Sequence, residues 1–110
     1  MKVLVIWKAL VSEAYHKRFI ELARFKDIEL ALVVPTKWRN TRLEKEHCSE
    51  YKIIPGKIIL NGSNHFHWYL GLERIIRQVR PDILHIEEEH YSIVTYQAIR
   101  LAKKYKVKCM

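Results

Sequence analysis

The segment 80–92, Arg-Pro-Asp-Ile-Leu-His-Ile-Glu-Glu-Glu-His-Tyr-Ser, constrains the fold more than any other part of the sequence. Pro81 cannot continue a helix that arrives from the amino-terminal side, and it moves Arg80 out of the helical region of backbone space. The mostly apolar run 83–86 is typical of a strand buried on both faces, as the strands of a parallel sheet are. Three carboxylates follow directly. The segment therefore predicts a parallel strand with an acidic corner at its carboxyl end.

The adjacent carboxylates of Glu87, Glu88 and Glu89 repel one another, so their position needs an explanation. The dipole of a following helix favours acidic side chains in its first turn by about 0.3–1 kcal/mol each, which would account for one or two of them. Alternatively, they accept hydrogen bonds from the hydroxyl groups of a polar ligand or pair with a basic ligand. In open α/β sheets, ligands bind outside the carboxyl ends of the strands, where this corner lies. Position alone does not separate the two explanations.

The amino-terminal part of the chain, up to Pro35, predicts a βαβ unit with a right-handed crossover. The apolar run 3–7 is typical of a central buried strand, and the run 28–34 of a second strand that Pro35 ends. Ser12, between them, is suited to cap a helix. Apolar side chains then recur at the spacing of a helix face that packs against a sheet. These side chains are Tyr15, Phe19, Leu22 and Ala23.

The middle of the chain has a weaker pattern. Residues 36–50 are dense in charge and have no clear period, so we expect a loop with at most a short helical turn. Trp38 in this loop is expected to fold onto the domain, although contact with a ligand is an alternative. Residues 51–54 and 57–60 predict two short strands around a Pro-Gly turn signal, arranged either as a hairpin or as one bent strand.

Two further helices and two further strands complete the alternation. Apolar residues at helical spacing predict a helix over 68–79, and Ser92 is suited to cap another that runs to about residue 105. The last strand is expected over 107–110. The alternation predicts one Rossmann-like domain over residues 1–110, with a doubly wound, mostly parallel sheet in three αβα layers. Because the sequence stops within that last strand, we expect an incomplete fold, either a fragment of a larger protein or a truncated gene product.

Composition and charge narrow the class of protein. The 110 residues suffice for one domain, and 49% hydrophobic with 29% charged residues exclude a disordered chain. The formal net charge of +8 suits nucleic acid, anionic lipid headgroups or phosphate-bearing substrates, without choosing among them. Residues 1–8 are too short in apolar length for a signal peptide or a membrane span. Cys48 and Cys109 are far apart and outside any Cys-x-x-Cys motif, so we expect reduced thiols in a cytoplasmic protein.

No metal or cofactor site is predicted. The six histidines show no zinc-finger or His-Glu-x-x-His spacing, although His65 and His67 could lie on one side of an extended segment. His85 lies within a strand and is expected to be buried beside a polar neighbour. His90 follows the carboxylates, which would favour its protonated form and make acid–base chemistry conceivable. The turn 7–12 contains no glycine, which excludes a dinucleotide fingerprint or a P-loop there.

Three segments carry a resemblance to a known family: KVLVI at 2–6, ALVSEAYHKRFIELA at 9–23 followed by IELALVVP, and RPDILHIEEEHYS at 80–92. In this order they resemble the amino-terminal domain of glycosyltransferase family 4, and the resemblance covers nearly the whole chain. The third segment is closest to members with acidic residues after this strand. Two features differ from the family pattern. Residues 8–12 replace a glycine-rich turn, and the histidine that many members carry after the following strand lies beyond Met110.

The resemblance implies a transferase of the GT-B fold with two Rossmann-like domains, of which this chain supplies the first part of the acceptor domain. A sugar would pass from a nucleotide-sugar donor, held by a missing carboxyl-terminal domain, to a hydroxyl group of a sugar or lipid-linked acceptor. The basic surface would approach such an acceptor at an anionic bilayer. No catalytic residue is assigned, and the chain alone is expected to be inactive. The residues expected to bind the acceptor are Glu87, Glu88, Glu89, His90, Tyr91, Lys8 and Ser12.

Two other functions stay open at this point. The chain could be a basic binding module for nucleic acid, although its lysines and arginines are spread over helices and loops and match no known binding motif. It could also be an inactive structural fragment. If the chain ends at Met110, the uncovered sheet edge and helix faces favour self-association through paired or exchanged strands.

Overall fold

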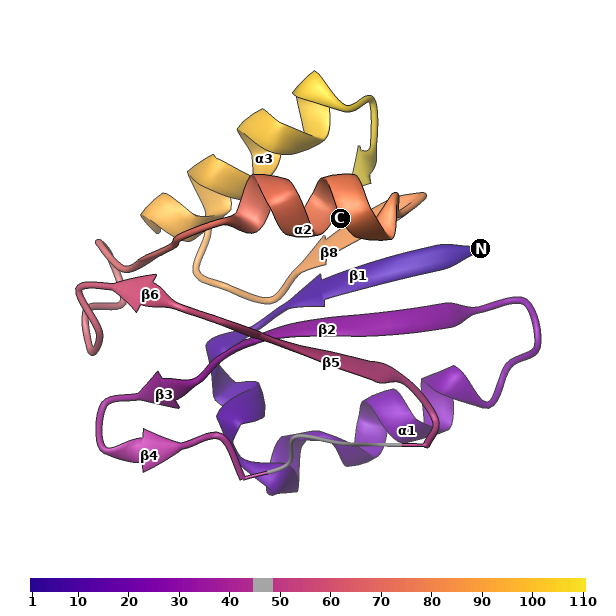
Figure 1. The fold of residues 1–110 in the computed structure, drawn as a ribbon, viewed down its shortest axis with the longest axis horizontal. Coiled ribbons are helices and arrows are strands. Elements are labelled where there is room, and N and C mark those ends of the chain that lie inside the picture. Colours follow the sequence, from indigo (N-terminus) through magenta and orange to yellow (C-terminus); the bar gives the residue numbers. More distant parts are fainter. Residues whose placement is uncertain (45–48) are drawn as a thin grey trace.

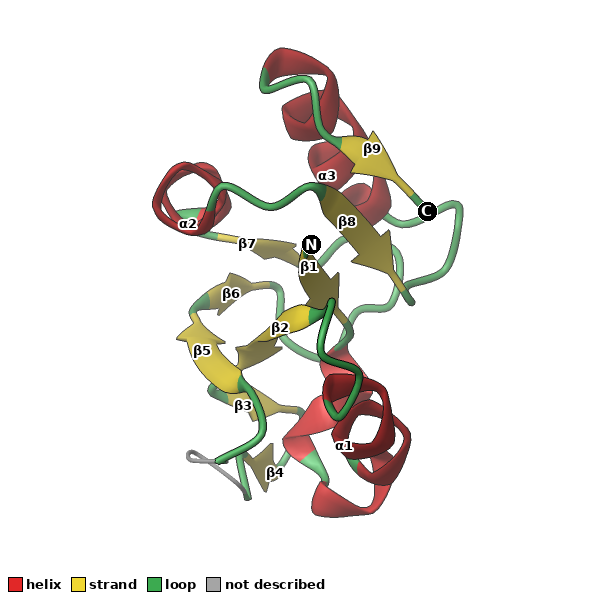
Figure 2. Ribbon diagram, turned by 90° about the vertical axis from the view of Figure 1, so that its right-hand side faces the viewer, coloured by secondary structure: helices red, strands yellow, loops and turns green. Residues whose placement is uncertain are grey.

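The computed structural model describes residues 1–44 and 49–110 (Figure 1). A five-stranded, all-parallel sheet with the strand order β5-β2-β1-β8-β9 lies at the centre of the molecule. From one edge to the other, the strands are β5 (Lys52–Gly56), β2 (Glu29–Pro35), β1 (Lys2–Ile6), β8 (Ile83–Ile86) and β9 (Lys108–Cys109). Figure 2 shows them succeeding one another across the sheet. The predicted doubly wound parallel sheet is confirmed.

The strand order reverses beside β1, the central strand. The chain runs from β1 outward to β2 and β5, and then returns past β1 to β8 and β9. At the carboxyl end of β1, Ile6 is paired with Val33 of β2 and with Ile86 of β8. In open α/β sheets, the ligand crevice lies outside the carboxyl ends of the two strands at such a reversal. The residues that follow β1 and β8 therefore define the candidate site.

Helices lie on both faces of the sheet, which gives the three predicted layers (Figure 1). On one face, α2 (Leu72–Val79) and α3 (Ile93–Lys104) pack against the even-numbered apolar residues of β1. On the other face, α1 (Lys17–Ala23) packs against Val3 and Val5. The side chains of a strand alternate between faces, so a continuous apolar run such as β1 supplies both cores.

The predicted helix after Ser12 is shorter than expected. Two 3₁₀ segments, η1 (Lys8–Val11) and η2 (Glu13–Tyr15), precede α1, and the side chain of Ser12 caps neither helix. Tyr15, which was predicted to belong to the apolar stripe that packs on the sheet, is exposed. His16, which directly precedes α1, is buried, and its ring nitrogens hydrogen-bond to the Leu10 carbonyl (2.7 Å) and the Tyr51 hydroxyl (2.5 Å). These contacts hold the chain in a tight turn before the α-helix begins.

The expected loop 36–50 contains a short antiparallel hairpin. Its strands are β3 (Lys37–Trp38) and β4 (Thr41–Arg42), and residues 45–48, with Cys48, lie outside the described part of the chain. Trp38 is half-buried against the domain, as expected. The hairpin alternative for 51–54 and 57–60 is wrong. After β5, the chain continues into β6 (Ile58–Ile59), which belongs to a different, two-stranded sheet.

The partner of β6 is β7 (Trp68–Tyr69), so the prediction that Trp68 begins a helix is wrong. Tyr69 is fully buried, and its ring lies so close to Gly56 that a Cβ there would approach Tyr69 Cδ1 to 2.8 Å. Trp68 is separated from the apolar residues of α2 by intervals typical of a helix, but it does not belong to that helix. Gly71, with φ 75°, adopts the left-handed conformation that separates β7 from α2.

The carboxyl-terminal part of the chain agrees with the sequence analysis. Ser92 caps α3, because its Oγ accepts a hydrogen bond from the Thr95 backbone N–H at 3.2 Å. The last strand, β9, is shorter than predicted, and Cys109 in it carries an exposed thiol. Among the described residues, no helix is both long enough and apolar enough to span a bilayer.

We predict that Ser92→Ala lowers the free energy of unfolding by about 0.5–2 kcal/mol, because it removes the cap of α3. The matched change Ser12→Ala should alter stability much less, since the Ser12 side chain makes no capping hydrogen bond. Urea unfolding of both variants and the unmodified protein measures the difference. Equal losses for the two serines would contradict this assignment.

Candidate functional site

Lys8 and Glu88 join the carboxyl ends of β1 and β8. The backbone N–H of Lys8 donates to Glu88 Oε1 at 2.6 Å, and Lys8 Nζ donates to Glu88 Oε2 at 2.9 Å. The Glu88 side chain is fully buried, and that of Lys8 is 11% exposed. A carboxylate buried in this way is tolerated because donors satisfy both of its oxygens. Two residues that the sequence analysis assigned to acceptor binding therefore contact each other.

Glu89 also contacts Lys8, with distances of 3.2 Å and 2.8 Å from Nζ to its two carboxylate oxygens. Its side chain remains 33% exposed. No acidic residue lies in the first turn of α3, so stabilisation by the helix dipole does not account for these glutamates. Their neighbours are instead basic side chains of the chain itself, which the sequence analysis did not anticipate.

An aromatic and polar wall lies beside this ion pair. The Trp38 ring lies 5.4 Å from Lys8 Nζ and 4.7 Å from the His67 ring. His67 is fully buried, and its Nδ1 hydrogen-bonds to the Ser63 carbonyl at 2.6 Å. His67 Nε2 lies 3.5 Å from Glu88 Oε2, which is longer than the usual hydrogen-bond range. Nothing in the sequence indicated that His67 would be near Glu88.

The ionisation of this cluster follows from these contacts. Burial by itself raises the pKa of Glu88, but the neighbouring His67 and the ammonium and amide of Lys8 outweigh burial and lower it. Given the longer distance to His67, we assign most of this effect to Lys8. Burial alone would lower the pKa of Lys8, whereas its hydrogen bonds to Glu89 and Glu88 raise it. Both partners are therefore charged at neutral pH, which keeps the pair intact.

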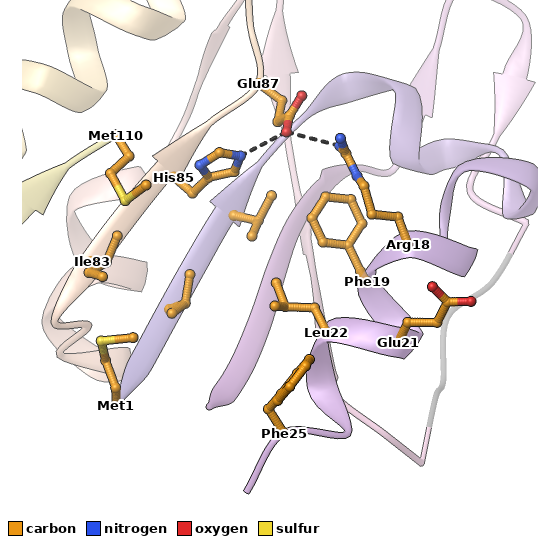
Figure 3. A pocket seen from close by; sticks show the side chains of 12 residues that line it. Met1, Arg18, Phe19, Glu21, Leu22, Phe25, Ile83, His85, Glu87 and Met110 are labelled. Carbon is orange, nitrogen blue, oxygen red and sulfur yellow. Dashed lines mark hydrogen bonds and ion pairs between the residues drawn. The ribbon is translucent and has the colours of Figure 1, made fainter. Parts of the chain in front are cut away.

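Glu87 has different neighbours from the two glutamates that follow it. Its Oε1 accepts a hydrogen bond from Arg18 Nη2 at 2.9 Å and lies 2.7 Å from His85 Nε2 (Figure 3). Among the described residues, no donor contacts Oε2. Burial raises the pKa of Glu87, but the hydrogen bond from His85 and the charge of Arg18 outweigh burial and lower it. Glu87 is thus an ionised acceptor with one open oxygen.

His85 is less buried than the sequence analysis predicted. Its side chain is 32% exposed, although it has the expected polar neighbour in Glu87. The His85 side chain lines a cavity, and toward that edge of the sheet β8 is followed only by the short strand β9. Arg18 is held in place by stacking on the Trp7 ring, 5.3 Å from the ring centre. Neither Arg18 nor Trp7 had been assigned to the site.

A cavity of about 610 Å³ lies on the α1 face of the sheet, with Glu87 at one end (Figure 3). Its floor is formed by strand residues such as Val5 and Ile83, and α1 contributes Phe19 and Leu22 to its wall. Arg18 and His85 accompany Glu87 at the polar end. This volume and mixture of many apolar with few polar groups match those of small-molecule sites in proteins.

The other predicted residues lie outside this cavity. Ser12 is half-buried, and its backbone N–H donates to the Ala9 carbonyl. His90 and Tyr91 are exposed, and the Tyr91 ring stacks on His65 with 4.5 Å between ring centres. The structure therefore brings Lys8 together with Glu88 and Glu89 and places Glu87 at one end of the cavity, whereas Ser12, His90 and Tyr91 lie apart from it.

His65 and His67 do not form a metal site, since one is exposed and the other is buried. Within the described residues, no group of three or more histidine, cysteine or acidic side chains is placed to hold a metal ion. In comparisons with protein-family models, curated proteins and solved structures, the chain had no significant match. The functional argument below therefore uses the geometry of the chain itself.

We predict that Lys8→Met lowers the free energy of unfolding by about 3–5 kcal/mol, because it leaves the buried Glu88 carboxylate without its counter-ion. Chemical denaturation measures the change. The control is Lys104→Met, which removes an exposed ion pair with Glu73 and should have little effect. If the two variants were equally stable, the Lys8–Glu88 pair would not be the structural contact described above.

Stability should also fall in acid because of Glu88. The pKa of Glu88 is lower in the folded protein than its ordinary value of 4.5, so its contribution is present above that value and is lost as the pH falls through the folded pKa. We predict that Glu88→Gln reduces the slope of unfolding free energy against pH below about pH 5. Urea unfolding at a series of pH values tests this. An unchanged slope would contradict the lowered pKa.

Proposed function

We propose that this chain is the acceptor-binding part of a glycosyltransferase and that it holds a hydroxyl-bearing acceptor at the carboxyl ends of β1 and β8. The observation that supports the proposal best is Glu87. It is an ionised carboxylate beside the reversal of the strand order, at one end of a cavity of ligand size, and one of its oxygens has no donor among the described residues. The resemblance of three sequence segments to glycosyltransferase family 4 agrees with this position.

The role of Glu87 follows from its ionisation. A carboxylate accepts hydrogen bonds only, and sugar hydroxyl groups are suitable donors to it. The lowered pKa makes Glu87 a weak base, so it suits orientation of an acceptor hydroxyl better than abstraction of its proton. Arg18 and His85 share Oε1, fix the carboxylate and leave Oε2 for the acceptor. Such positioning accelerates a transfer by holding the reacting groups in place.

The remaining chemistry requires groups beyond those described above. Departure of a nucleoside diphosphate needs positive charge or hydrogen-bond donors near the leaving phosphate. Lys8 and Arg18, the lysine and arginine described at the site, are already paired with carboxylates. We therefore propose that a further domain supplies the donor site, and that this chain alone binds acceptors without transferring sugar.

We predict that free monosaccharides shift backbone amide signals at residues 85–89 and in α1 in a nitrogen-15 NMR titration. Glucose, galactose, mannose and N-acetylglucosamine are the probes. Glu87→Gln should weaken the binding of the best probe about tenfold or more, because it replaces a charged acceptor by a neutral amide.

The control for this experiment is Glu29→Gln, which changes an exposed carboxylate at the amino end of β2, away from the site. It should leave the titration unchanged. The proposal fails if none of the four sugars shifts these amides, or if the two glutamate variants weaken binding equally.

A further inference from the structure

The layer formed by α2 and α3 carries most of the excess positive charge of the chain. The segments 72–80 and 93–108 contain eight lysine and arginine residues and a single acidic residue, Glu73. The rest of the chain contains twelve basic and eleven acidic residues, so it is nearly neutral. In the sequence the two segments are separate, but the fold places them side by side on one face of the sheet (Figure 1). The positive charge is therefore concentrated on one side of the molecule.

These cations are available to a partner. Glu73 accepts hydrogen bonds from Lys104 Nζ at 2.7 Å and from the Tyr105 hydroxyl at 2.8 Å, so its charge is already offset within the layer. Among the described residues, the other lysines and arginines of the two segments have no carboxylate within ion-pair distance. We define the basic patch by six exposed residues: Arg77, Arg80, Arg100, Lys103, Lys104 and Lys106.

Exposed apolar side chains accompany the basic patch on α3. The exposed fractions are 65% for Tyr96, 41% for Ile99 and 38% for Ile93. Spacings of three and four residues place these side chains on the same side of the helix as Arg100 and Lys103, opposite the side that packs on the sheet. The outward side of α3 thus has an apolar amino-terminal half and a basic carboxyl-terminal half.

The apolar area continues from α3 onto the chain before α2. Leu70 is exposed, and it lines the same groove as Tyr96, Arg100 and Lys104. Arg77 and Arg80 lie beside Tyr105 in a second groove, farther along the line where α2 meets the end of α3. Apolar and basic side chains from both helices therefore form one continuous surface.

We infer that this surface, the α2/α3 face, binds an anionic lipid bilayer. Anionic headgroups complement the basic patch, and the interfacial region of a bilayer accepts exposed isoleucine, leucine and tyrosine side chains. The phosphates of a nucleic acid would also attract the cations, but they offer no apolar surface to Ile93 and Ile99. The inference does not rest on the proposed role of Glu87, because the cavity beside Glu87 lies on the opposite face of the sheet.

Co-sedimentation of the full chain with lipid vesicles tests the inference. Vesicles of phosphatidylcholine alone are compared with vesicles in which about a third of the lipid is phosphatidylserine. We expect the chain to sediment with the anionic vesicles and to stay in solution with the neutral ones. Added salt should weaken the binding, because it screens the attraction between exposed charges.

Two residues of the basic patch can be replaced without disturbing the fold. Arg80 and Lys106 have φ values of 51° and 55°, a conformation that glycine adopts most readily, so the double variant Arg80→Gly, Lys106→Gly should remain folded. Each lysine or arginine near an anionic bilayer contributes about fivefold in affinity, and we expect this variant to bind anionic vesicles roughly tenfold or more weakly.

The control is the double variant Lys17→Gln, Arg24→Gln. It makes the same change in net charge with two exposed cations at the two ends of α1, on the other face of the sheet. It should bind anionic vesicles like the unmodified chain. Equal losses in the two double variants would overturn the inference, since binding would then follow total charge and not the α2/α3 face.

The apolar part of the surface is tested by Tyr96→Ser, which should weaken vesicle binding several-fold because it removes an exposed ring from the apolar half of α3. Its control is Tyr15→Ser, a change at a comparably exposed tyrosine outside the α2/α3 face, which should have no effect. The inference is overturned if anionic vesicles bind no better than neutral ones. It is also overturned if Tyr96→Ser leaves vesicle binding unchanged while duplex DNA binds more tightly than vesicles, because the partner would then be nucleic acid.

Discussion

The buried ion pair between Lys8 and Glu88 is the contact on which the rest of the site depends. It joins the residues that follow the two central strands of the sheet, and it does so through both the backbone and the side chain of Lys8. A buried pair of this kind adds little stability over a well-packed apolar pair, but loss of either partner is costly. Its main consequence is therefore geometric, since it fixes where the chain goes after β1 and after β8.

This fixed geometry gives three adjacent glutamates three different environments. Glu88 is enclosed, Glu89 is partly exposed beside the same lysine, and Glu87 contacts Arg18 and His85. Opposite charges next to each carboxylate offset the repulsion between neighbours, so all three remain ionised. Only Glu87 combines ionisation with an open oxygen and an adjoining cavity, which is why the proposed function depends on it.

The sequence predicted those parts of the fold that local patterns determine. The strand β8 is bounded by Pro81 and the glutamates, and α3 begins at a serine cap, so both were predicted at nearly their observed residues. The sequence could not indicate contacts between distant segments. Trp68 has the spacing of a helix residue, yet it pairs with β6 and lies in a strand.

The contacts of the site also join distant segments, and the sequence did not indicate them. Glu87, Glu88 and Glu89 look equivalent in the sequence, and the basic residues that distinguish them come from a separate part of the chain. Lys8 was assigned to the site because it follows β1, but its role as the buried partner of Glu88 depends on strand order. Nothing in the sequence indicated that Arg18 would belong to the site, because charged residues on a helix usually face solvent.

A carbon-13 carboxyl NMR titration tests the division of roles among these glutamates most directly. We expect Glu87, Glu88 and Glu89 each to titrate below the ordinary glutamate pKa. Replacing Arg18 by leucine should raise the pKa of Glu87 and leave that of Glu88 nearly unchanged, because the guanidinium contacts Glu87. Equal shifts of all three carboxyl groups in that variant would contradict the account, since they would indicate one shared acidic cluster.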